Sequence, residues 1–373
     1  MQNIIFKIFF ILLFTVLNWS CTPGPKPEPK AKNIILLIGD GMGLTQVSTS
    51  FYFKSEEPHF ARFKKIGFIN TSSSSHKITD SAAGATAFSA GVKTFNRAIG
   101  VDSTKKSIPT ILEIAEDKGL ATGVIATSSI THATPASFYA HVPSRYMQEE
   151  IAEYLTDSGV DFFAGGGKKF FLDREDSVNY VDKLTENGFQ MNTEELAAPE
   201  SFDINQRYGY LLAADGMPRM LDGRGDFLLD ATNMGLNYLS QKKEGFFLMV
   251  EGSQIDWGGH ANNADYIVTE VLDFDKTIGL ALDFAMKDKE TLVIVTADHE
   301  TGGFALSSGK DAEGKDDYHI INGTFSTGGH TTTLIPVFAY GPGADKFAGI
   351  YQNNEIFHKM LEAYGWGGNE EIQ

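Results

Sequence analysis

The chain has only one cysteine, Cys21, among its 373 residues. A lone cysteine excludes an internal disulfide, so the fold must be held by packing and by any metal that it binds. Basic residues are also few, since 31 Lys and Arg stand against 48 Asp and Glu, a net charge of -17. This balance argues against nucleic acid as a binding partner, because phosphate backbones are held by clustered Lys and Arg. An anionic substrate therefore requires a local source of positive charge, such as bound metal.

No apolar run near the N-terminus is long enough to form a permanent membrane span. Lys7 precedes an apolar stretch over 8–17, and Cys21 follows it after a short polar segment. This order is typical of an export signal and resembles a bacterial lipoprotein signal. We expect a signal peptide over 1–21, a Pro- and Lys-rich tether over 22–32, and a periplasmic or cell-surface protein that touches the membrane only through a lipid on Cys21. The alternative is a plain cleaved secretory peptide.

Short apolar runs alternate with longer helical patterns from residue 33 onward. The runs lie at 34–38, 122–126, 246–250, 292–296 and 334–340, and the helical patterns lie at 107–118, 265–286 and 354–364. This alternation predicts an α/β fold, a three-layer α/β/α sandwich around a large and mostly parallel sheet. We expect one catalytic domain over 33–366, with a peripheral excursion around 168–222 and a tail over 367–373.

Polar residues follow several of the apolar runs directly. Asp40 comes after the first run, Glu251 after the third, and Asp298 and His299 after the fourth. In an open parallel sheet the carboxyl ends of the strands form the ligand crevice. We therefore expect these carboxylates and the histidine to converge there as a metal site.

Each motif taken alone also has an ordinary structural interpretation. Residues 39–43 are Gly-rich and typical of a turn, and the Asp-to-His run over 256–260 is compatible with a simple loop. Three ionisable residues at 298–300 directly after a strand are costly unless they are paired or bind metal. The small residues over 79–87 suit a close-packed helix, and they would also let an anion approach Ser81 at the positive end of that helix.

Together these pieces resemble the alkaline phosphatase family. The matching motifs lie in the family's order over roughly 33–345, at 38–43, 80–94, 131–135, 251–260, 296–303 and 328–331. So many ordered matches make coincidence a poor explanation. The resemblance implies the alkaline phosphatase fold and a metal-dependent phosphomonoesterase.

The resemblance also implies three divalent metal positions, two for zinc, or cobalt in its place, and one for magnesium. The first set is Asp256, His260 and His330; the second is Asp40, Asp298 and His299; the third is Asp40, Thr134 and Glu251. Ser81 corresponds to the nucleophile at the second position, and Arg145 to the arginine that binds phosphate. His132 and Trp257 stand beside the third position, where one bacterial branch has Asp and Lys. This departure leaves the identity of the third metal open.

The implied reaction converts small phosphate monoesters to an alcohol and inorganic phosphate through a phosphoserine intermediate. Family members are often homodimers, and the sequence is compatible with that state. A phosphodiesterase of the same superfamily and a non-catalytic phosphate- or metal-binding lipoprotein remain alternatives. A sulfatase is excluded by the Ala and Gly residues over 82–85 that follow Ser81, because sulfatases have Pro and Arg there.

Overall fold

A single ten-stranded sheet forms the centre of the computed structural model, which describes residues 29–366. Cys21 and the predicted signal peptide lie outside the described residues, as does the predicted tail. From one edge to the other, the strands are β14 (Gly349–Gln352), β2 (Lys65–Asn70), β13 (Ile335–Tyr340), β8 (Thr291–Thr296), β1 (Asn33–Gly39), β7 (Phe246–Gly252), β3 (Ala121–Ser129), β4 (Phe162–Gly166), β6 (Arg207–Leu211) and β5 (Phe189–Asn192).

The sheet is parallel except at one strand. β13 runs antiparallel to both of its neighbours, β2 and β8, while the other adjacent strands pair in parallel. Each residue of β1, β7 and β8 is buried. Central parallel strands are covered on both faces, which is why they appear in the sequence as continuous apolar runs. All five predicted runs form strands of this sheet.

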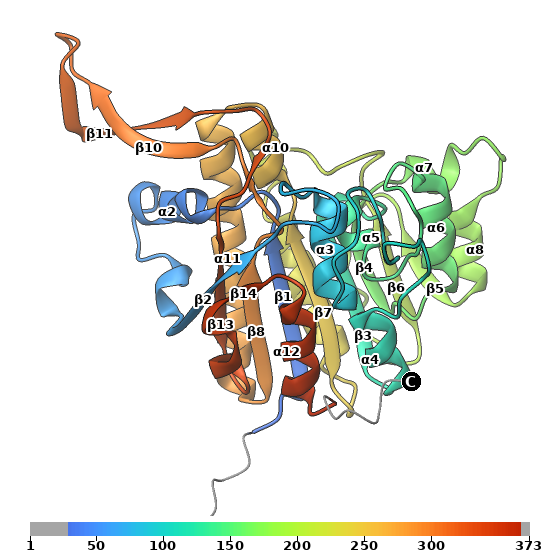
Figure 1. The fold of residues 1–373 in the computed structure, drawn as a ribbon. Coiled ribbons are helices and arrows are strands. Elements are labelled where there is room, and N and C mark those ends of the chain that lie inside the picture. The colour runs from blue at the N-terminus through green and yellow to red at the C-terminus, as the bar shows by residue number, and fades with distance from the viewer. Residues whose placement is uncertain (1–28, 367–373) are drawn as a thin grey trace, which may run out of the picture.

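Helices cover both faces of the sheet, which confirms the predicted three-layer α/β/α sandwich (Figure 1). One layer contains α9 (Phe227–Leu239) and α11 (Ala264–Asp288), with α2 (Leu44–Phe53) and η1 (His59–Arg62) packed against α11. The other contains α3 (Ser81–Ala90), α4 (Ile111–Asp117), α5 (Ala133–Ala136) and α12 (Glu355–Tyr364). In the described part of the chain, none of the helices has the length and apolar character needed to cross a membrane.

The helix predicted over 107–118 begins later than expected. Its first residue is Ile111, because Thr110 caps it by accepting a hydrogen bond from the Glu113 backbone N–H. The Glu113 side chain in turn accepts from the Thr110 N–H, which completes a capping box. The cap therefore decides where this helix begins.

The remaining elements lie at the edges of the sheet. β5 and β6, together with α7 (Lys169–Leu172) and α8 (Tyr180–Glu186), belong to the segment over 168–222, so part of this excursion extends the central sheet. β10 (Phe304–Lys310) and β11 (Asp316–Phe325) form a hairpin that projects from the body in Figure 1. The other short elements are α6 (Gln148–Asp157), η2 (Met220–Asp222), α10 (Gln254–His260), β9 (Glu300–Thr301), β12 (His330–Thr331) and η3 (Ala344–Phe347).

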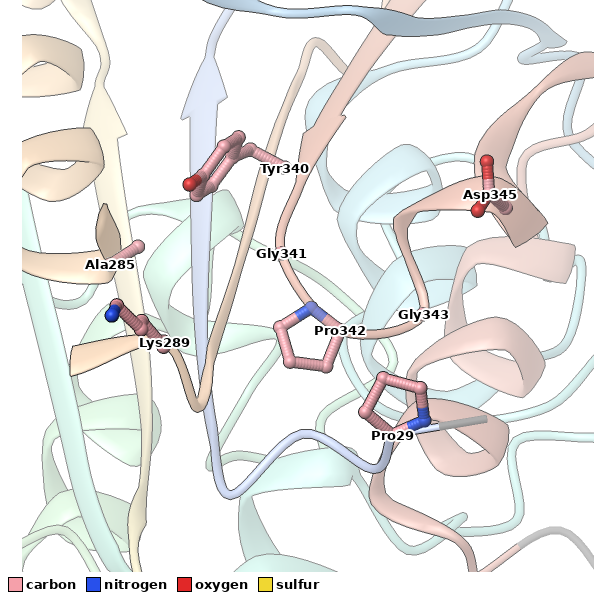
Figure 2. A pocket seen from close by; sticks show the side chains of 8 residues that line it. All are labelled: Pro29, Ala285, Lys289, Tyr340, Gly341, Pro342, Gly343 and Asp345. Carbon is pink, nitrogen blue, oxygen red and sulfur yellow. The ribbon is translucent and has the colours of Figure 1, made fainter. Parts of the chain in front are cut away.

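The first described residues enter the fold at the end of the sheet where the parallel strands begin. Figure 2 shows Pro29 near Pro342 and Gly343, in a cavity of about 320 Å³ that Lys289 and Tyr340 also line. Lys289 shortly precedes β8, and Tyr340 is the last residue of antiparallel β13. The carboxyl ends of the parallel strands therefore lie at the opposite end of the sheet from Pro29.

A buried ion-pair triad fastens the loop around η2 to α11. The Arg224 guanidinium donates to the Glu270 carboxylate and, at 2.9 Å, to Asp273 Oδ2, and these side chains are almost completely buried. Glu270 also accepts from the Met220 N–H at 2.9 Å. Removing one partner from such a group leaves an uncompensated buried charge.

We expect Arg224→Met to lower the free energy of unfolding by about 3–5 kcal/mol, because Glu270 and Asp273 lose the cation that compensates them. Urea unfolding of purified protein measures the change. Arg219→Met is the matched control, since Arg219 pairs with Asp222 at the surface and its loss should have little effect. Similar small changes in both variants would contradict a stabilising role for the triad.

Candidate active site

Carboxylates from three central strands meet at the carboxyl edge of the sheet, as the sequence predicts. Asp40 follows β1, Glu251 lies near the end of β7, and Asp298 follows β8. The parallel register places Ile38 of β1 opposite Glu251, so strands far apart in the sequence end together. Asp40, Glu251 and Asp298 are fully buried.

Three groups of side chains here have ligand atoms within 4.8 Å of one another: Asp256, His260 and His330; Asp40, Asp298 and His299; and Asp40, His132 and Glu251.

The first group presents two imidazole nitrogens to one carboxylate. His260 Nδ1 lies 2.7 Å from the Gly328 carbonyl oxygen, and His330 Nδ1 lies 2.9 Å from the Thr79 carbonyl oxygen. A carbonyl oxygen only accepts, so each Nδ1 carries a proton and each neutral ring has its lone pair on Nε2. The two Nε2 atoms are 3.2 Å apart, and both face Asp256. Facing lone pairs repel, and a cation between them removes that repulsion.

The second group places Ser81 beside two carboxylates and a histidine. His299 Nε2 lies 3.4 Å from Ser81 Oγ, 3.2 Å from Asp298 Oδ2 and 3.5 Å from Asp40 Oδ1. Asp298 Oδ1 accepts from the Gly41 N–H at 3.2 Å and from the His299 N–H. Within residues 29–366, three carboxylate oxygens accept no hydrogen bond: both oxygens of Asp40 and Oδ2 of Asp298. These oxygens are therefore free to bind a cation.

The third group adds His132 to the predicted oxygen ligands. Glu251 Oε2 accepts from Ser253 Oγ and, at 3.1 Å, from Ser128 Oγ, whereas Oε1 has no hydrogen-bond partner among the described residues. Burial raises the pKa of Glu251, and the hydroxyls of Ser253 and Thr134 partly oppose this rise, although Thr134 Oγ1 forms no hydrogen bond of normal geometry among the described residues. Asp40 and Glu251 of the predicted set therefore lie together, with His132 beside them.

Burial and mutual repulsion act against the negative charge of these carboxylates. Burial, followed by the charges of Asp298, Asp256 and Glu251, raises the pKa of Asp40 well above its usual value. Burial likewise raises the pKa of Glu251 to about 7 and raises that of Asp298. Divalent cations would offset this repulsion, and the carboxylate and imidazole donors are those that such ions bind. The residues present therefore fit bound metal at the first two groups, and the carboxylates of Asp40 and Glu251 fit one at the third.

Arg145 is held at the mouth of this site by two side chains and one carbonyl. Its guanidinium donates to Asp80 Oδ2 at 3.3 Å and lies 3.0 Å from His132 Nε2, while its backbone N–H donates to the Arg97 carbonyl oxygen at 2.8 Å. Burial and the charge of Arg145 lower the pKa of His132 to about 3, so this imidazole is neutral and accepts from the guanidinium. Arg145 is thus a cation at the site, and some of its N–H groups remain available to donate to a bound anion.

Trp257 packs behind His132. Their rings meet edge to face with centroids 6.1 Å apart. The Trp257 indole also lies close to Gly216. A Cβ added to Gly216 would lie only 2.5 Å from Trp257 Cη2. Trp257 therefore supports the imidazole that contacts Arg145, and only glycine at 216 leaves room for it.

Ser81 is the first residue of α3, a helix whose ten residues are all buried. Asp80 caps this helix by accepting from the Ala83 N–H at 3.2 Å. A Cβ on Gly84 would lie 3.0 Å from Asp298 Cβ, so the small residues let the helix approach the metal ligands. The helix start also directs positive partial charge toward an anion near Ser81.

Thr301 connects the first two groups, and the sequence reasoning missed it. Its hydroxyl donates to Asp256 Oδ1 at 2.5 Å and lies 3.2 Å from His299 Nδ1. Because Asp256 can only accept, the hydroxyl accepts from His299 Nδ1–H, which leaves the His299 Nε2 lone pair facing the second group. The available signal was the spacing: residues 299 and 301 are two apart at the start of a strand and share a face.

Glu300 is a second residue that the sequence reasoning did not assign. Its buried carboxylate accepts from Gln46 Nε2 and from the Phe304 N–H, both at 3.0 Å, and from the Thr331 hydroxyl. It thereby ties α2 and β10 to β12, the short strand that carries His330. Alternation along the chain directs Glu300 away from His299, so it braces the site from outside.

Comparison with known proteins gives consistent matches over most of the chain. A sequence profile described as alkaline phosphatase matches residues 31–322. Alkaline phosphatase 3 of Bacillus subtilis (strain 168) is 36% identical, with 90% of this chain and 89% of that protein covered. Alkaline phosphatase of Escherichia coli (strain K12) is 32% identical, with 91% and 87% covered. The solved structure of alkaline phosphatase from the Antarctic bacterium TAB5 has a TM-score of 0.89 and 55% identity, and covers 91% of this chain and 100% of that chain.

We expect Thr301→Val to weaken metal binding at both groups by about 10- to 100-fold, because His299 and Asp256 lose the hydroxyl that orients them. Titration of metal-free protein with zinc, followed by calorimetry, measures the affinity directly. Thr301→Ser keeps the hydroxyl and should bind zinc like the parent chain. If the valine and serine variants bind zinc equally well, the hydroxyl does not orient these ligands.

Proposed function

This chain belongs to the alkaline phosphatase family, and from that premise we propose that it cleaves phosphate monoesters through a phosphoserine formed on Ser81. It is a phosphoric monoester hydrolase that uses divalent metal ions. The observation that carries the proposal is the position of Ser81, a buried hydroxyl 3.4 Å from His299 Nε2 at the start of a helix. A non-catalytic phosphate-binding protein has no need for a nucleophile at that point.

We propose that the group of Asp256, His260 and His330 and the group of Asp40, Asp298 and His299 each hold zinc or cobalt. Two-imidazole and mixed nitrogen and oxygen sets with room for a further ligand suit catalytic zinc. Asp40, Thr134 and Glu251 supply the oxygens that suit magnesium at the third position. Metal analysis of the purified protein tests this assignment, and three zinc ions per chain would contradict it.

The first step transfers the phosphoryl group to Ser81. Bound divalent cations supply Lewis acidity, which favours a deprotonated serine hydroxyl and offsets charge on the phosphoryl oxygens. Ser81 Oγ attacks phosphorus in line with the ester oxygen, the new P–O bond forms, and the alcohol leaves. Arg145 donates to two nonbridging oxygens, and Asp80 and His132 hold its guanidinium in place for that contact.

The second step returns Ser81 to its starting state. Water attacks the phosphorus of phosphoserine from the side that the alcohol left, the bond to Ser81 Oγ breaks, and inorganic phosphate is released. The positive start of α3 stabilises the serine oxygen as it regains negative charge. The acidic chain can bind a phosphate dianion because the positive charge is confined to this site.

We also propose that the protein is exported and anchored through a lipid on Cys21. Pro29, the first described residue, lies at the end of the sheet opposite the site, so an anchor that precedes it would not have to cross the catalytic cleft.

We expect Ser81→Ala to abolish phosphoenzyme formation and to lower turnover roughly 10³-fold or more, because the covalent step loses its nucleophile. Acid-quenched reactions with labelled substrate trap the phosphoenzyme. A chromogenic monoester assay, with and without chelator, measures the rate. Normal turnover in this variant would refute the assignment of Ser81.

Arg145→Ser should reduce kcat/KM for monoesters by roughly 30- to 1,000-fold and should affect diesters much less. A monoester dianion offers the guanidinium a pair of charged oxygens, whereas a diester replaces one oxygen with an ester group. Both specificity constants are measured for the same variant. Equal losses would favour the phosphodiesterase alternative.

We expect Cys21→Ser to move the protein from the membrane fraction to the soluble fraction, because the tether alone has nothing to insert into a bilayer. Cell fractionation followed by activity assay of each fraction checks this. Unchanged fractionation would support a plain secretory peptide instead.

A further inference from the structure

The cleft above the proposed site is much larger than a phosphoryl group. Its volume is about 560 Å³, and Arg145, His260 and His330 line its inner part. Ile78, Arg97 and Tyr146 also line it but belong to none of the candidate metal groups. We call these three residues the rim. A phosphoryl group consists of only a few atoms, so most of this space is available to the rest of the substrate.

The rim shares its cleft with Arg145 and with two histidines of the first candidate metal group. Ser81 is only 2% exposed and directly follows Asp80, which lines the cleft. In an in-line displacement the leaving oxygen points away from the attacking oxygen. The alcohol therefore points away from the buried Ser81, and the cleft that Tyr146 and Ile78 line is the space available to it.

Tyr146 offers an open aromatic face at this mouth. It directly follows Arg145 and is 69% exposed. The Arg97 guanidinium lies over the ring, 5.4 Å from its centroid. One face of the ring is thus in contact with a cation, and the 69% exposure of the residue leaves ring surface accessible for stacking. Ile78, 44% exposed, adds apolar surface to the same cleft, and Asn96 holds its carbonyl at 3.1 Å.

Arg97 is rigidly tied to the proposed catalytic residues. Its backbone N–H donates to Asp80 Oδ1 at 2.9 Å, and its carbonyl accepts from the Arg145 N–H. Its φ of 78° lies in the left-handed region, which a residue with a side chain rarely adopts. Such strain persists only where the surrounding contacts impose it. These contacts set the position of the Arg97 and Tyr146 pair relative to Ser81.

We propose that the rim is a subsite for the leaving alcohol and that it favours monoesters whose alcohol carries a planar heterocycle, as nucleoside 5′-monophosphates do. The inference rests on the proposed function. Every nucleobase has a π face that stacks on an aromatic ring regardless of its hydrogen-bonding edge. A bare sugar phosphate carries its phosphoryl group on the same primary hydroxyl oxygen but has no planar ring system to stack. The rim therefore selects by the presence of the planar group.

The experiment compares adenosine 5′-monophosphate with ribose 5-phosphate, which share the same ester bond and differ only at the base. We expect the metal-loaded parent enzyme to favour the nucleotide through a lower KM. In Tyr146→Ala, the ratio of kcat/KM for the nucleotide to kcat/KM for ribose 5-phosphate should fall about 5- to 100-fold. Tyr146→Phe retains the ring face and should keep the ratio of the parent enzyme.

Tyr52→Ala is the matched control, because Tyr52 is a similarly exposed tyrosine on α2 that does not line the cleft. Tyr52→Ala should change kcat/KM for neither the nucleotide nor ribose 5-phosphate. Calorimetric titration with adenosine, which has no phosphate, gives an independent readout: binding should be present in the parent enzyme and lost in Tyr146→Ala.

An unchanged ratio in Tyr146→Ala, or equal adenosine binding in both proteins, would overturn the subsite. If the parent enzyme hydrolyses ribose 5-phosphate without any preference for the nucleotide, the subsite is wrong while the phosphomonoesterase proposal stands. If it hydrolyses neither ester, the proposed function itself has failed.

Discussion

The concentration of negative charge at the carboxyl edge of the sheet is the constraint on which the site depends. Asp40, Glu251 and Asp298 are fully buried, and Asp256 lies beside them. Buried carboxylates without compensation are costly and tend to take up protons instead. Burial raises the pKa of Asp40, Glu251 and Asp298, and the charges of neighbouring carboxylates add to the rise for Asp40 and Glu251. Divalent cations are the natural compensation, so metal binding, stability and catalysis are coupled here.

A ring of hydrogen bonds around this charge determines what each ligand can do. Backbone carbonyls of Gly328 and Thr79 hold the protons of His260 and His330 on Nδ1, and the Thr301 hydroxyl does the same for His299. All three imidazoles therefore direct lone pairs inward. This outer ring comes from loops and short strands beyond the sheet, and it turns a cluster of polar residues into directed ligands.

The positive side of the site is built by a separate set of contacts. Arg145 reaches the cleft from the loop before α6, and its position depends on Asp80, His132 and the Arg97 carbonyl. Asp80 is shared, because it also caps the helix that begins with Ser81. The nucleophile and the proposed phosphate-binding arginine are therefore positioned by a common residue, and the strained backbone of Arg97 joins the same arrangement to the cleft mouth.

Apolar runs and the polar residues after them determined much of this protein from sequence alone. β1, β3, β7, β8 and β13 were legible because central strands are buried on both faces, and the convergence of Asp40, Glu251 and Asp298 followed from the geometry of parallel strands. Tertiary structure alone decided that β5 and β6 extend the sheet and that β10 and β11 project as a hairpin. It also decided which ring nitrogen of each histidine carries the proton. Backbone carbonyls carry no residue-type signal, and the contact between His330 and Thr79 joins residues 251 positions apart, so no local pattern could predict it.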